Sequence, residues 1–170
     1  MKQKRGSKKA QMKMSFGMIF SIILIIIFIA FAFYAIKKFL GLQNAVTVGQ
    51  FKDKLTSDID KIWKGSQGSQ SEEYSLPKKI EYACFVDFSS PASGINQDYY
   101  SKLKQAYYGS ENLIFYPFGS GDGMDSFEIS HIDLAKITTV ENPYCIKNDG
   151  GKIKLTIEKG FGENLVNIKR

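Results

Sequence analysis

The chain has 170 residues, which is about the length of one domain, and it carries a formal net charge of +6. Residues 1–14 hold six Lys or Arg and no acidic residue, Lys37 and Lys38 add two more, and residues 39–170 hold 15 Lys or Arg against 17 Asp or Glu. A nucleic-acid-binding domain carries its basic residues on the folded part, so this distribution argues against that class of protein.

An uncharged segment of 22 residues, Ser15 to Ile36, follows the basic terminus, and 19 of these residues are apolar. As a helix it would extend about 33 Å, enough to cross the hydrocarbon core of a bilayer, and a lone segment in lipid satisfies its backbone hydrogen bonds only as a helix. The sequence therefore predicts a single transmembrane helix at residues 15–36. More basic residues precede the segment than directly follow it, which predicts that residues 1–14 are cytoplasmic and that the C-terminal domain is extracellular.

Two other interpretations of the apolar segment stay open. Ala30-Phe31-Ala32 matches the small-x-small pattern of a cleaved secretory signal, although the apolar stretch continues past it. A buried helix of a soluble core is disfavoured, because no polar residue marks an exposed face.

The pattern becomes amphipathic after the apolar segment and predicts a stalk helix at residues 37–64. No Pro occurs before residue 70, so we expect one near-continuous helix from about Ser15 to Trp63, with two helices hinged near Gly41 as the alternative. The apolar residues of the stalk recur every three or four positions, which is helical spacing: Val48, Phe51, Leu55, Ile59 and Ile62.

Residues 65–75 repeat a Gly-Ser-Gln unit and are interpreted as a flexible linker. Alternating polarity then predicts a β domain at residues 76–170, with a helix at Gln97–Tyr108 capped by Asn96. The expected fold class is α+β, in which a long helix, transmembrane plus amphipathic stalk, precedes a small antiparallel β-sheet domain. The last three strands are expected to form a meander, and the predicted strands are 80–88, 112–116, 127–132, 137–140, 144–147, 152–158 and 165–168.

The chain has two cysteines, Cys84 and Cys145, and both fall in predicted strands on the side expected to be extracellular. Pairing is the default outside the cell, so we predict a disulfide; two buried free thiols are the alternative. A reactive thiol is disfavoured, because it would need a nearby histidine and His131 is the only one in the chain.

Sequence motifs for catalysis and cofactor binding are absent: there is no Walker A loop, dinucleotide-binding glycine pattern or HExxH. The Gly-rich loop with Asp122, Asp125 and Glu128 is a weak candidate for a calcium site, but its spacing does not match an EF-hand, and a solvated loop is favoured. We therefore expect no cofactor, no metal and no enzymatic activity. Tyrosines near the predicted helix are interpreted as packing residues, with a recognition surface as the alternative: Tyr99, Tyr107 and Tyr116.

The N-terminus carries a short motif, Lys8-Lys9-Ala10-Gln11, ahead of the apolar helix, stalk and β domain. This order resembles archaeal type IV pilin-like proteins, whose leader is a class III signal peptide. The resemblance implies that a prepilin-type peptidase cuts after Ala10 and leaves Gln11 as the new N-terminus. It also implies that the apolar helix stays on the mature chain and packs against identical helices, because moving from lipid into such a bundle changes the surroundings little.

Two functions are weighed on these grounds. The first is a membrane-anchored pilin-like structural subunit or minor pseudopilin at the cell surface, whose partners are membrane lipid, the peptidase, and copies of itself or other pilin-like subunits. The second is a monomeric membrane-anchored binding or adhesion domain that forms no filament.

Overall fold

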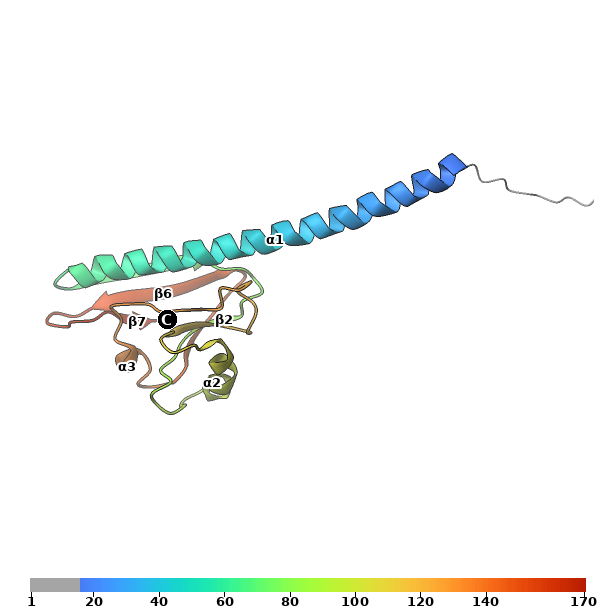
Figure 1. Ribbon diagram of the computed structural model, residues 1–170. Coiled ribbons are helices and arrows are strands. Elements are labelled where there is room, and N and C mark those ends of the chain that lie inside the picture. Colours follow the sequence, from blue (N-terminus) through green and yellow to red (C-terminus); the bar gives the residue numbers. More distant parts are fainter. Residues whose placement is uncertain (1–15) are drawn as a thin grey trace, which may run out of the picture. The chain divides into compact units, whose positions relative to one another are not determined.

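The computed structural model describes Phe16–Arg170, so the predicted leader residues Lys8, Lys9, Ala10 and Gln11 lie outside the described residues. The fold is α+β: a long N-terminal helix is followed by a small antiparallel β domain, as predicted (Figure 1). The chain divides into two compact units, Met1–Phe39 and Leu40–Arg170. The second unit therefore includes the last part of the helix as well as the β domain.

Helix α1 is uninterrupted from Phe16 to Lys64, as predicted, and the alternative of two helices is wrong. Gly41 and Gly49 lie within it and introduce no break. Helix α1 ends where the Gly-Ser-Gln repeat begins, because Gly65 and the polar residues after it favour a turn over a further helical turn.

Two antiparallel sheets form the β domain. Sheet A has the order β1-β6-β7, and sheet B has the order β4-β3-β2-β5. Three short helices lie in the connections between strands of sheet B: α2 Gln97–Leu103, η1 Lys104–Ala106 and α3 Leu134–Ile137. The strands are β1 Gly68–Ser75, β2 Tyr82–Phe85, β3 Leu113–Tyr116, β4 Ser126–Phe127, β5 Tyr144–Lys147, β6 Lys152–Lys159 and β7 Asn167–Lys169.

The main hydrophobic core lies between helix α1 and the two sheets of the second unit. In Figure 1 the C-terminal part of α1 runs along β6. Four helical residues, Val48, Phe51, Leu55 and Ile59, are at most 3 % exposed and belong to the same buried cluster as the inward residues of sheets A and B. The stalk stripe is thus part of the domain core, which gives a small β domain the additional apolar surface it needs.

The prediction of a flexible linker at residues 65–75 is wrong, because Gly68–Ser75 forms strand β1. It pairs with β6 over its full length, from Gly68 opposite Lys159 to Ser75 opposite Lys152. Its residues alternate between partly buried and exposed positions, and the next-to-last residue, Tyr74, is buried. The strand has polar residues on both faces, so the apolar alternation that marks other strands is missing.

The predicted meander of the last three strands is also wrong. Strand β5 pairs with β2 in sheet B, whereas β6 pairs with β1 and β7 in sheet A. A turn does occur between β5 and β6, but the Asn148 amide donates to the carbonyls of Pro77 and Ile80 at 3.0 and 2.6 Å. These bonds tie the turn to the segment before β2, and the chain passes there from one sheet to the other.

Three smaller predictions differ from the structure. Residues 137–140 are not a strand, because α3 forms instead and Asp133 caps it by accepting a hydrogen bond from the Lys136 backbone at 2.9 Å. The strand predicted at 127–132 is reduced to Ser126–Phe127. The helix predicted at 97–108 ends earlier, and the Asn96 side chain makes no capping bond; its amide donates to Glu141 at 3.2 Å.

Candidate functional site

The first candidate site is the apolar segment of helix α1, which we define as Phe16–Ile36. All of its residues are exposed. By length and composition, helix α1 is long and apolar enough to cross a membrane. The segment carries no charged residue. Its length of 21 residues corresponds to about 32 Å, which matches the hydrocarbon thickness of a bilayer.

A polar group inside the apolar segment is satisfied by the helix itself. The Ser21 hydroxyl donates to the carbonyl oxygen of Gly17, one turn earlier, at 2.8 Å. A hydroxyl bonded in this way needs no water and no partner chain, so it is compatible with a lipid environment. The apolar segment therefore combines two features of a membrane-spanning helix: apolar side chains on all sides and a serine hydroxyl that is satisfied within the helix.

The second candidate site is the packed segment of helix α1, which we define as Leu40–Lys64. Its buried stripe contacts aromatic residues of both sheets: the Phe51 ring lies 5.7 Å from the ring of Tyr74 in β1 and 5.7 Å from that of Phe115 in β3. Leu55 and Ile59 continue the stripe and are fully buried. Because one helix face meets two sheets, the packed segment is held to the domain by its core rather than by surface contacts alone.

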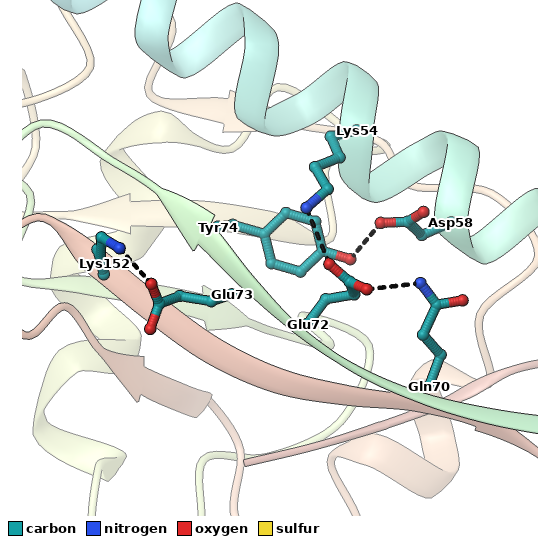
Figure 2. Close-up of polar contacts among 7 residues, drawn as sticks. All are labelled: Lys54, Asp58, Gln70, Glu72, Glu73, Tyr74 and Lys152. Atoms are coloured by element: carbon teal, nitrogen blue, oxygen red, sulfur yellow. Dashed lines mark hydrogen bonds and ion pairs between the residues drawn. The ribbon is translucent and has the colours of Figure 1, made fainter.

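Polar contacts border this stripe and connect the packed segment to β1 (Figure 2). The Tyr74 hydroxyl donates to the Asp58 carboxylate at 2.8 Å, and the Lys54 ammonium donates to Glu72 at 2.9 Å. The Gln70 amide also donates to Glu72, at 2.8 Å, and the Lys54 ammonium lies 4.9 Å from the centre of the Tyr74 ring. These contacts fix how the helix is rotated about its axis against the strand.

The charges at this border shift the proton affinities of the groups involved. The hydrogen bond from Lys54, and then that from Gln70, hold the pKa of the Glu72 carboxyl below its usual value. Burial, followed by the hydrogen bond to Asp58, raises the pKa of Tyr74, so its hydroxyl stays a neutral donor. On the other face of β1, Glu73 forms an ion pair with Lys152, which Figure 2 shows pointing away from the helix.

The last turn of α1 is fixed by contacts with the connection between β4 and α3 and with the end of β6. The His131 imidazole stacks on the Trp63 indole with centroids 3.6 Å apart, and its Nδ1 lies 2.9 Å from Asp60. Lys159 donates to the carbonyl oxygens of Trp63 and Gly65 at 2.7 and 3.0 Å. A cation placed on the free carbonyls of a helix C-terminus stabilises it, so this end is capped by the domain.

The predicted disulfide between Cys84 and Cys145 is present, with an S–S distance of 2.06 Å. The two residues lie directly opposite each other in β2 and β5, and their Cα atoms are 4.0 Å apart. Since both sulfurs are bonded to each other, neither cysteine is a thiol nucleophile in this structure. His131 is likewise engaged, with Asp60 and Trp63, and lies in neither β2 nor β5.

The weak calcium candidate is not assembled in the structure. Asp122 forms an ion pair with Lys79, and the hydrogen bond from Lys79, then one from Asn44, keeps the pKa of Asp122 low. The Asp125 carboxylate accepts a hydrogen bond from the backbone of Gly121 at 2.7 Å. Among Phe16–Arg170 no group of three or more His, Cys, Asp or Glu is placed to hold a metal ion, so Asp122, Asp125 and Glu128 do not form such a group.

Comparison with protein-family models, with curated proteins and with solved structures finds no match for this chain. The functional interpretation therefore depends on the sequence and on the contacts described above.

Proposed function

We propose that the chain is a single-pass, membrane-anchored surface protein that serves as a pilin-like structural subunit or minor pseudopilin. The observation that carries the proposal is that one uninterrupted helix holds a charge-free segment of bilayer length and, further along, a stripe that forms part of a β domain's core. A helix with both properties can anchor the chain through its first part and contribute to the domain core through its second. The proposed role is structural and requires no catalytic group.

The orientation follows from the distribution of charge. Six Lys or Arg precede the apolar segment and two directly follow it, which favours a cytoplasmic N-terminus and an extracellular β domain. The Cys84–Cys145 disulfide supports the same orientation, because disulfides persist in oxidising compartments. The disulfide and the charge distribution are independent observations, and both support an extracellular domain.

The proposed assembly uses the apolar segment twice. In the membrane it is surrounded by lipid, and in a filament it would be surrounded by the same segment of other subunits. The two environments are similarly apolar, so close packing rather than hydrophobic transfer would drive the exchange. Cleavage between Ala10 and Gln11 by a prepilin-type peptidase would come first, and the mature subunit would then leave the membrane for the filament.

The processing step tests the proposal through a pair of matched variants. Lys8→Glu/Lys9→Glu reverses the charges beside the proposed cut, whereas Lys2→Glu/Lys4→Glu makes the same change in charge further from it. We expect the first variant to keep its leader and the second to be processed like the unmodified chain, as read from the intact mass of each protein extracted from its own cell membranes. Equal processing of both variants would contradict cleavage by a leader-specific peptidase.

Filament formation is tested separately by negative-stain microscopy of material sheared from cells that express the chain. We expect thin filaments that disappear when the chain is deleted. A processed chain that stays in the membrane fraction and yields no filament would favour the monomeric anchored domain instead.

A further inference from the structure

The second face of sheet B is covered over only part of its area. Strand pairing places Cys84, Ile114 and Cys145 on this face, where they pack against Leu103 of α2 and Ala106 of η1. One residue pair further along, the same face carries Tyr82 opposite Tyr116 on one side and opposite Lys147 on the other. There the tyrosines are only partly buried and Lys147 is exposed.

Three aromatic rings meet at this uncovered end. Tyr99 of α2 lies 5.4 Å from Tyr82 and 4.5 Å from Tyr116, measured between ring centroids, and Tyr82 lies 6.4 Å from Tyr116. We call Tyr82, Tyr99 and Tyr116 the tyrosine platform. Clustered aromatic rings that stay partly exposed provide a rigid contact surface whose ordering costs little conformational entropy.

The hydroxyl groups distinguish these tyrosines from their neighbours. Tyr100 and Tyr107 border the same buried cluster, but their hydroxyls donate to the main-chain carbonyls of Ser90 and Gly109 at 2.9 and 2.7 Å. Within Phe16–Arg170, no main-chain carbonyl accepts a hydrogen bond from a hydroxyl of the tyrosine platform. Tyr100 and Tyr107 therefore act as packing residues. The platform hydroxyls are not tied to the main chain: Tyr99 and Tyr82 share a side-chain hydrogen bond, and all three tyrosines stay partly exposed.

Two cations border the tyrosine platform. The Lys102 ammonium lies 5.4 Å from the Tyr99 ring centroid and 5.6 Å from that of Tyr116, and Lys147 lies opposite Tyr82 in the strand register. In the part of the chain that the structure describes, neither lysine forms an ion pair with an acidic residue. Glu81 is the nearby acid, and it contributes to the raised pKa of Tyr99, after burial and the neighbouring tyrosines.

We propose that the tyrosine platform binds an acidic polysaccharide. A sugar ring has a flat C–H face and a rim of hydroxyls. The C–H face suits the partly exposed aromatic surface of the platform, and Lys102, whose ammonium lies over the Tyr99 and Tyr116 rings, is placed to meet the polar rim. A carboxylate on the sugar would then meet Lys102 or Lys147, which have no acidic partner of their own. Binding sites of this kind combine aromatic surface with a few polar groups that set specificity.

The position of the platform favours a sugar over an extended acidic peptide. A peptide that binds a sheet usually adds a strand to its edge, where main-chain groups are free. Tyr82 and Tyr116 lie on β2 and β3, which are inner strands of sheet B and are paired on both sides. The platform therefore presents side chains rather than free main-chain groups.

The test uses the full chain in detergent micelles and measures binding of oligogalacturonate by calorimetry, with malto-oligosaccharide of equal length as the neutral comparison. We expect the acidic oligosaccharide to bind more tightly and to lose affinity as salt is raised. Tyr99→Ala should weaken binding about tenfold, which is the scale of a tyrosine hot spot. Tyr108→Ala is the matched control, since Tyr108 is 79 % exposed and lies outside the platform.

Charge variants test the same site without touching the core. Lys102→Gln should weaken binding of oligogalacturonate several-fold, whereas Glu81→Gln should strengthen it, and both residues are exposed. The proposal is overturned if oligogalacturonate does not bind, if Tyr99→Ala and Tyr108→Ala behave alike, or if Lys102→Gln leaves binding unchanged. Polyglutamate that binds as tightly as oligogalacturonate, with the same dependence on Tyr99, would show that the ligand is an acidic peptide and would overturn the sugar assignment.

Discussion

The apolar segment and the packed segment belong to one helix, yet they meet opposite surroundings. In the apolar segment every residue is exposed, including large side chains such as Phe28 and Phe31. In the packed segment one stripe is buried by the β domain, while all the charged residues of the segment lie outside that stripe. The same backbone conformation therefore serves two different environments.

The comparison shows how side-chain distribution selects the environment of a helix. A stripe of apolar residues can be covered by one face of a protein, as the sheets cover Leu55 and Ile59. A helix that is apolar on all sides is not covered by one face, so it requires lipid or a ring of other helices. This difference between the two segments can be tested by making the same kind of substitution in each.

Charges introduced into the two segments should have the most different effects. Ile25→Lys/Ile26→Lys places two cations near the middle of the apolar segment, each of which costs about 3 kcal/mol for insertion at the centre of a membrane helix. We expect this variant to be lost from the carbonate-washed membrane fraction. Gln50→Lys/Ser57→Lys adds the same charge at exposed positions of the packed segment and should stay in that fraction. A variant at positions 25 and 26 that resists carbonate would contradict a spanning helix.

Truncation of a leucine should lower the free energy of unfolding more in the packed segment than in the apolar segment. Leu55→Ala opens a cavity in a fully buried site, and we expect it to lower the free energy of unfolding of the domain by about 2–5 kcal/mol in urea titrations of the micelle-bound chain. Leu24→Ala removes the same atoms from the apolar segment, where detergent refills the space, and should change that free energy by less than about 1 kcal/mol. Equal losses would mean that the packed segment does not belong to the domain core.

The polar border of the packed segment should contribute less and should depend on pH. Tyr74→Phe removes the hydrogen bond to Asp58 and should cost about 1–2 kcal/mol of unfolding free energy near neutral pH. The folded state raises the pKa of Tyr74 above its usual value of 10.0, so this contribution is fully present below about pH 10 and is lost as pH rises further. Urea titrations from pH 7 to 11 should therefore show the two proteins converging at the alkaline end, and a constant difference would contradict the shift.

The smallest effect is expected at the start of the packed segment. A Cβ built on Gly41 meets nothing within 4 Å, so Gly41→Ala should stabilise the chain by about 0.5–1 kcal/mol through better helix propensity. Gly94→Ala is the control of opposite sign, since Gly94 has φ +77° and its Cβ would lie 2.4 Å from that of Glu141. Urea titrations measure both variants, and a lower free energy of unfolding for Gly41→Ala would contradict this expectation.

The parts of the fold that the sequence predicts are those with a local apolar period. The spacing of Val48, Phe51, Leu55 and Ile59 predicts the packed stripe, and the alternation around Cys84 predicts β2. Strand β1 has no such period, because its inward positions Gln70 and Glu72 meet the polar border of helix α1 rather than the core. Its partner β6 also lies about 80 residues later in the chain, which no local pattern records.

The choice of sheet is likewise decided by distant contacts. The Asn148–Gly151 turn is visible in the sequence, but the bonds from Asn148 to Pro77 and Ile80 that separate β5 from β6 are not. The tyrosine platform is also formed by residues that are distant in the sequence. The sequence draws attention to Tyr99 and Tyr116, whereas Tyr82 joins them only through the register of β2 against β3.

The central claim is that the apolar segment stays on the mature chain and holds the β domain at the cell surface. The most direct test is the intact mass of the native protein, determined separately for the membrane fraction and the culture medium. We expect a membrane-bound chain that begins at Gln11 and retains Phe16–Ile36. A protein found in the medium and beginning at Phe33, directly after Ala32, would show that the segment is a cleaved secretory signal and would contradict both the anchor and the proposed assembly.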